Sequence, residues 1–180
     1  DVLYHMLEAG QDITSVEMDY LDYVQSEEEY FSSERYLKDQ AYWESKYENQ
    51  PERTVVKISP ATSGSIAAKR ITKVLPAVLE QKIDEFCRQH PVTQAVLFET
   101  ALMIYLSKIN PENSAVTIGV PVLNRSNAKE RKIAGMFVST MPLTLVINET
   151  ETVGELSAKI TKEHMNIFRH QKYPYSSILQ

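Results

Sequence analysis

The side chains that most often carry catalysis are few and scattered in this sequence. Its four histidines are His5, His90, His164 and His170, and no two of them are placed as ligands on one helical face. Cys87 is the one cysteine, so the clusters of cysteine and histidine that hold zinc are missing and no intrachain disulfide is possible. We therefore expect no metal site, and we interpret Cys87 as a small buried hydrophobic residue of a helix.

Other sequence patterns of self-contained active sites are missing as well. The five glycines do not form a phosphate-binding loop, and no Gly-x-Ser-x-Gly segment is present. Asp19 and Asp22 have the spacing of one helical face, but acids on a surface helix are usually solvated. The residues by themselves predict no complete catalytic centre.

The composition is that of a folded domain, with 43% hydrophobic and 24% charged residues in 180. A net charge of −5 argues against nucleic acid as a partner. The longest nearly uncharged segment, 95–106, is too short to cross a membrane. The single cysteine fits a reducing compartment, so we expect a cytoplasmic protein. The first residue is Asp and the opening reads like the end of a helix, which predicts a piece of a longer polypeptide.

The segment 115–146 has the strongest pattern in the chain. Two apolar runs rich in Val, Ile, Thr and Phe flank a polar break at 124–132, which predicts two buried strands joined by a solvated loop. The runs also contain two glycines and two prolines, which often mark places where a ligand or another backbone approaches: Gly119, Pro121, Gly135 and Pro142. A binding surface is expected here first.

Helical spacing and capping residues predict the remaining elements. We expect helices ending at Gly10, starting at Ser15, running from Ser32 or Ser33 towards Gln50, and covering 76–90, 93–109 and 152–170. The 93–109 helix is apolar almost all round, which predicts burial on most sides. Further strands are expected at 54–58 and 70–75, and an extended segment at 173–175. Helices interleaved with strands predict an α/β domain, a sheet with helices laid on it.

Three stretches resemble a known family. Asn124-Arg125 with 133–143 (IAGMFVSTMPL) resembles the "NR … IGxFVNTxPLR" signature of condensation domains from nonribosomal peptide synthetases. Upstream, Tyr20-Leu21-Asp22-Tyr23, Glu29-Tyr30, Asp39 and Tyr42-Trp43 resemble "YxDY … ExxY … DxxYW". Downstream, 170–175 (HQKYPY) resembles "HQDYPF". The three occur in the family's order and span nearly the whole chain.

The resemblance implies a fold and an activity. The fold would be a chloramphenicol acetyltransferase-like lobe, a mixed sheet with flanking helices, with 1–14 as the tail of a first lobe and 15–180 as most of the second. The intact domain would form an amide bond between a carrier-bound acyl or peptidyl thioester and a carrier-bound aminoacyl thioester. The family's catalytic His-His-x-x-x-Asp-Gly motif is not in this sequence, so the chain alone is expected to be inactive.

The family's motifs also imply site residues. Candidates for the wall of the substrate tunnel are Gly135, Phe137, Ser139 and Thr140. Candidates that support the site are Asn124, Arg125, Asp22, His170 and Gln171. Departures from the family pattern include Ser139 in place of the commoner Asn and Lys172 in place of the commoner Asp.

The resemblance further implies partners and leaves alternatives open. No cofactor is expected on the chain itself, whereas the phosphopantetheine arms of upstream and downstream peptidyl carrier domains would enter the tunnel. A neighbouring adenylation domain and the first lobe would complete the assembly, with no nucleic acid or membrane. The alternatives are an epimerisation-type or other two-lobed acyltransferase domain, or a non-catalytic docking module of the same fold.

Overall fold

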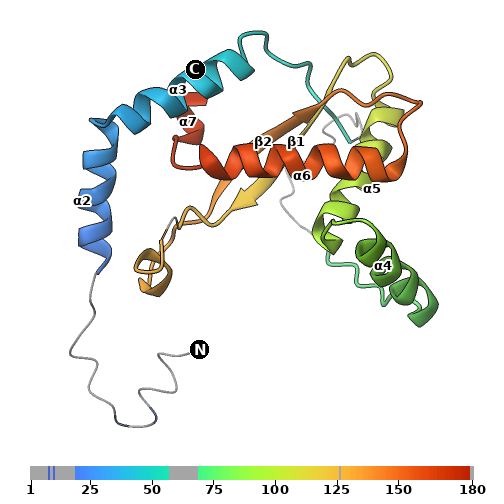
Figure 1. Ribbon diagram of the computed structural model, residues 1–180, viewed down its shortest axis with the longest axis horizontal. Coiled ribbons are helices and arrows are strands. Elements are labelled where there is room, and N and C mark those ends of the chain that lie inside the picture. The colour runs from blue at the N-terminus through green and yellow to red at the C-terminus, as the bar shows by residue number, and fades with distance from the viewer. Residues whose placement is uncertain (1–7, 9, 11–18, 57–68, 126, 179–180) are drawn as a thin grey trace.

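The computed structural model describes residues 8, 10, 19–56, 69–125 and 127–178, so the predicted helix ending at Gly10 lies largely outside the described residues. Figure 1 shows helix α6 running across a β-ribbon, with α2 and α4 at opposite ends of the molecule. The elements are α2 (Tyr20–Phe31), α3 (Glu34–Lys46), α4 (Ala77–Gln89), α5 (Gln94–Ile109), β1 (Val116–Val122), the short 3-10 helix η1 (Glu130–Lys132), β2 (Ser139–Leu145), α6 (Val153–Arg169) and α7 (Tyr175–Ile178).

The ribbon consists of β1 and β2, which pair antiparallel with Val116 opposite Leu145 and Val122 opposite Ser139. Successive side chains of a strand point to opposite faces. One face therefore carries the large apolar residues, and the other carries small ones: Thr117, Gly119, Pro121, Thr140, Pro142 and Thr144. The two strands predicted from the apolar runs are confirmed.

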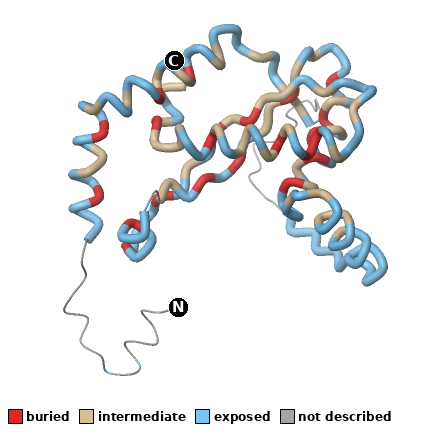
Figure 2. Tube along the Cα trace, viewed as in Figure 1, coloured by how far each residue is buried: buried red, intermediate tan, exposed pale blue. Residues whose placement is uncertain are grey.

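The main core lies between the apolar face of the ribbon and the helices α5 and α6. Met103, Met141, Leu143 and Ile160 are completely buried there. In Figure 2 the buried segments follow the ribbon and the facing sides of these helices. The buried hydroxyls of Thr100 and Ser157 share a hydrogen bond of 3.0 Å, so these two polar groups satisfy each other between α5 and α6.

The helix starts follow from local sequence. Thr93 caps α5, Ser33 caps α3, and Thr152 with Glu155 forms the predicted capping box of α6. The predicted start of a helix at Ser15 lies outside the described residues. The helix α2 begins at Tyr20 with Asp19 as its cap, because Asp19 and Asp22 satisfy each other's backbone N–H groups.

Three further expectations are corrected. Residues 70–75 are exposed and form no strand, since no described segment pairs with them. Residues 54–56 form no strand either, and 57–58 lie outside the described residues. The segment predicted to be extended at 173–175 turns instead into the short helix α7 at Tyr175.

Burial of two helices is smaller than their composition predicts. The helix α5 buries one side only, and Phe98, Leu102 and Tyr105 on the other side are 53%, 46% and 54% exposed. The helix α4 has no buried residue, and Cys87 on it is half-buried. In the described part of the chain no single helix is long and apolar enough to cross a membrane, and only α4 with α5, bent by 102°, meet the test of length and composition as a pair.

Candidate functional site

Two of the motif segments meet at Asn124. This residue follows β1 with a φ of 50°, a left-handed conformation that asparagine adopts more readily than most residues. Its backbone N–H donates to Oε1 of Gln171 at 3.1 Å, and the Gln171 amide donates to the carbonyl of Phe168 at 2.9 Å. The side-chain oxygen of Asn124 is buried and accepts no hydrogen bond from the residues that the structure describes. Asn124 and Gln171 therefore fix the exit of β1 against the end of α6.

The guanidinium of Arg125 organises the loop between the strands. It donates to the carbonyls of Glu130, Ile133 (2.8 Å) and Gly135 (3.3 Å), and it lies 3.8 Å from the centre of the Phe137 ring. A planar donor with five N–H groups suits such a set of carbonyls better than a lysine would. The structure thus places Arg125 as a support of the loop.

The loop packs on α2 through aromatic rings. Phe137 is 5% exposed and forms a small cluster with Tyr23 and Ile133, its ring lying 4.3 Å from that of Tyr23. The main chain of Gly135 passes so close to the ring of Tyr20 that an added Cβ would overlap it. Both candidate residues therefore face α2. Burial, and next the hydrogen bond to Glu27, raise the pKa of Tyr23 above its usual range, so this phenol stays neutral.

Ser139 and Thr140 point to different sides of the ribbon. Ser139 pairs with Val122 and shares its face with Met141, whereas Thr140 is exposed and pairs with Pro121 on the small-residue face. The four tunnel-wall candidates are consequently not gathered on one surface. Thr140, next to the exposed Gly119 and Pro121, is the one on the open face of the ribbon.

His170 belongs to a buried network. Its Nδ1 lies 2.7 Å from Asp39, and its ring stacks on Tyr42 with centres 4.0 Å apart. Asp39 is fully buried and also accepts hydrogen bonds from Tyr30 (2.8 Å) and Arg35 (3.2 Å). Burial, and next Asp39, raise the pKa of the Tyr30 phenol. The network joins α3 to the end of α6, so His170 supports the fold.

The remaining candidate, Asp22, is exposed and accepts the backbone N–H of Asp19 at 2.8 Å as part of the α2 cap. Sequence reasoning assigned no role to Asp39, Tyr20 or Glu130. Asp39 and Tyr20 belong to the family pattern. Their partners, His170 and Gly135, lie far away in the sequence, and no local signal identifies these partners.

The described surface near these segments includes a cleft and an exposed end of the ribbon. Among the described residues no group of three His, Cys, Asp or Glu side chains could hold a metal ion. A cleft of about 710 Å³ lies between α3, α7 and the ribbon, lined by Trp43, Tyr47, Pro142 and Tyr173 among others, and no tunnel-wall candidate lines it. The arrangement thus combines a β1–β2 loop that is fixed by hydrogen bonds with an open face of the ribbon.

The whole chain, residues 1–180, matches the family model described as condensation domain. It is 38% identical over 160 residues to surfactin synthase subunit 1 of Bacillus subtilis (strain 168), covering 89% of this chain and 4% of that relative. It is 24% identical over 179 residues to tyrocidine synthase 3 of Brevibacillus parabrevis, covering 98% of this chain and 3% of that synthase.

Solved structures agree in fold. The first condensation domain of the calcium-dependent antibiotic synthetase, in complex with substrate analogue 2a, superposes with a TM-score of 0.74 at 22% identity and covers 94% of this chain and 39% of that chain. VibH, a condensation enzyme, gives 0.73 at 20% identity and covers 97% and 41%. The predicted α/β fold is confirmed, and the chain spans about two fifths of these solved chains. Its full-length match shows that the chain belongs to the condensation-domain family.

Proposed function

We propose that this chain is the larger part of the second lobe of a condensation domain in a nonribosomal peptide synthetase. The intact domain joins a carrier-bound acyl or peptidyl thioester to the amine of a carrier-bound aminoacyl thioester and so forms an amide bond. The chain contributes one wall of the tunnel that the two phosphopantetheine arms enter. Membership of the family supports the reaction, and the geometry of the ribbon supports the wall.

The proposal of a tunnel wall is supported by one observation: the face of the ribbon at Thr140 is open. Thr140, Gly119 and Pro121 are exposed there, while the opposite face is filled by the core. Small side chains leave the backbone accessible along this end of the ribbon. A narrow acyl-carrying arm can lie against such a surface without displacing any packed side chain.

The chemistry itself is assigned to residues outside this chain. None of the four histidines has an adjacent histidine, so the His-His-x-x-x-Asp-Gly motif comes from elsewhere in the domain. In that motif the second His would position or deprotonate the attacking amine. We accordingly propose that the chain alone is inactive, and that its partners are the first lobe, two peptidyl carrier domains and an adenylation domain in the cytoplasm.

Substitution of Thr140 in the intact condensation domain tests the wall. In Thr140→Phe a ring would extend over Gly119, where an arm has to pass. We expect amide formation, measured by mass spectrometry with loaded carrier domains, to fall by about 10-fold or more, since small displacements of bound substrate are costly. The matched control is Thr150→Phe, the same change at another exposed threonine, in the turn before α6.

The outcomes separate the alternatives. Loss of product in Thr140→Phe, with a thermal midpoint equal to that of Thr150→Phe, supports the tunnel wall. Undiminished product in a folded Thr140→Phe domain overturns it. A domain that inverts the α-carbon of a carrier-bound residue without forming an amide is an epimerisation-type enzyme, and a parent domain that lacks the His-His-x-x-x-Asp-Gly motif is a docking module.

A further inference from the structure

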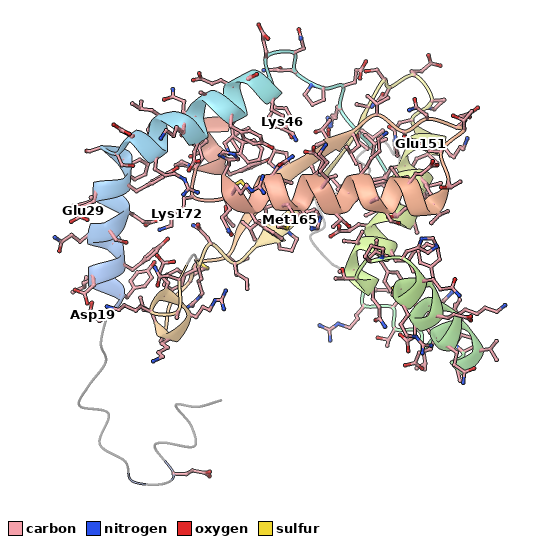
Figure 3. All side chains as sticks on the ribbon, viewed as in Figure 1. Asp19, Glu29, Lys46, Glu151, Met165 and Lys172 are labelled. Atoms are coloured by element: carbon pink, nitrogen blue, oxygen red, sulfur yellow. The ribbon has the colours of Figure 1, made fainter. Side chains whose placement is uncertain are left out.

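A second contact between the β1–β2 loop and the end of α6 is ionic. Glu130, in η1, has a side chain that is 3% exposed, and its Oε1 lies 3.1 Å from Nζ of Lys172, which is 23% exposed. Lys172, labelled in Figure 3, follows the C-terminal end of α6. This position is occupied here by lysine, whereas the family pattern commonly has aspartate.

Because the Glu130 side chain is buried, the sign of the charge at position 172 affects this contact. A carboxylate removed from water loses its hydration, and a close cation with good geometry replaces part of it. An aspartate at position 172 would remove this cation and add a second negative charge near the buried Glu130. The lysine of this chain and the glutamate in η1 therefore form a matched pair.

The pair acts on the same loop that Arg125 and Gln171 hold. Gln171 binds the start of the loop at Asn124, and the neighbouring Lys172 binds its middle at Glu130. Arg125 donates to the backbone carbonyl of Glu130 and, further on, to that of Gly135. Arg125 thus connects Glu130 to the end of the loop, from which β2 and Thr140 follow.

We infer that Lys172 is a positioning residue, whose ion pair with Glu130 sets the β1–β2 loop and through it the ribbon end that carries Thr140. The inference rests on the proposed function for its effect on amide formation, but not for its effect on the loop. The two opposite charges have to change together: a reversal at one position requires a reversal at the other.

Charge reversal in the intact domain tests this. In Lys172→Asp we expect amide hydrogen exchange of residues 127–137 to rise by about tenfold or more through local opening, while α5 and α6 keep their protection. Lys172→Asp combined with Glu130→Lys should restore slow exchange, because it rebuilds the pair with the charges swapped. Lys172→Arg should behave like the unmodified domain.

The matched control is Lys108→Asp. Lys108 pairs with Glu149 at 2.8 Å, but the two side chains are 63% and 86% exposed, so the same reversal there should leave exchange in 127–137 unchanged. Where Lys172→Asp does not fold, Lys172→Met and Glu130→Gln replace it, with the same expected rise and with the charge-swapped double variant still decisive.

Hydrogen exchange tests the effect of the ion pair on the loop, and kcat/KM tests its effect on amide formation. Unchanged exchange in 127–137 for Lys172→Asp, or failure of the swapped pair to restore it, overturns the ionic clamp. For amide formation we expect kcat/KM to fall about tenfold in Lys172→Asp and to recover in the double variant. Raised exchange with unaltered kcat/KM overturns the positioning role, whereas the proposed function stands or falls separately with Thr140→Phe.

Discussion

The backbone N–H of Asn124 donates to the side-chain oxygen of Gln171, which is 47 residues further along the chain. This one hydrogen bond links the segment after β1 to the segment after α6. The residue that donates it has a left-handed backbone conformation, with a φ of 50°. Two of the three motif segments that carry the family resemblance therefore form one structural unit.

Gln171→Ala removes the acceptor of this hydrogen bond. We expect the free energy of unfolding to fall by about 1 kcal/mol, the usual net worth of one such bond. Urea denaturation followed by circular dichroism measures it. Gln89→Ala, at an exposed glutamine that bonds Glu85, is the control and should change stability by less than about 0.5 kcal/mol. Equal values for the two variants would contradict the linking role.

Asp39→Asn breaks the buried network around His170. Because Asp39 is fully buried and accepts from three side chains, we expect a loss of about 3 kcal/mol. Glu34→Gln on the same helix removes a carboxylate whose pair with Lys38 is almost fully exposed and 3.9 Å long, and it should cost close to nothing. A thermal midpoint in Asp39→Asn as high as in Glu34→Gln would refute this account.

Gly135→Ala tests the close approach of Tyr20. The added methyl overlaps the ring, so we expect a loss of about 1–3 kcal/mol from overpacking. Combining it with Tyr20→Ala should give a smaller loss than the sum of the two single changes, because the double variant removes the overlap. Additive losses would show that the ring does not confine Gly135. Amide formation by the double variant then tests Gly135 as a tunnel residue. Restored turnover would show that Gly135 acts only through its packing against Tyr20.

The cap of α6 gives a dependence on pH. Hydrogen bonds from Thr152, first from its backbone and then from its side chain, lower the pKa of Glu155 below its usual range. The ionised carboxylate thus stabilises the fold above the unfolded pKa of about 4.3, and this contribution is lost as the pH falls through the lower folded pKa. We expect Thr152→Ala to cost about 1 kcal/mol at neutral pH. Glu155→Gln should flatten the decline in acid, because it removes the titrating carboxylate, whereas Thr152→Ala keeps the backbone N–H that bonds it.

Thermal unfolding between pH 7 and pH 3 checks this prediction. Thr150→Ala, two residues earlier and outside the cap, is the control and should reproduce the decline of the unmodified chain. A parallel decline in Glu155→Gln and Thr150→Ala would mean that the carboxylate of the capping box does not carry the acid sensitivity.

Local patterns predicted the elements whose causes are local. The structure confirms the cap at Thr152, the helix from Thr93 and the two strands of the ribbon. Each was predicted from residues that are close together in the sequence. The prediction of a strand at 70–75 was wrong because a strand needs a partner, and no described segment pairs with these residues. The helix α5 is half exposed for a related reason, since composition does not say how many sides are covered.

The contacts of the site could not be predicted in the same way. Asp39 meets His170 across 131 residues, and Tyr20 reaches the carbonyl of Met136 across 116. The resemblance identified the segments but not the side on which each side chain lies. Ser139 and Thr140, adjacent in one motif, point to opposite faces because they are neighbours in a strand.

The two prolines of the ribbon have a consequence for strand addition. The N–H of Thr117 donates outward to Thr54, and the carbonyl of Pro142 accepts outward from Tyr47, so these positions point away from the partner strand. By the same alternation Pro121 faces outward on β1, and neither proline has an N–H to offer. An incoming strand would meet a gap in its ladder on either side. The ribbon is thereby protected from pairing edge to edge with another copy, and an aggregate by that route is disfavoured.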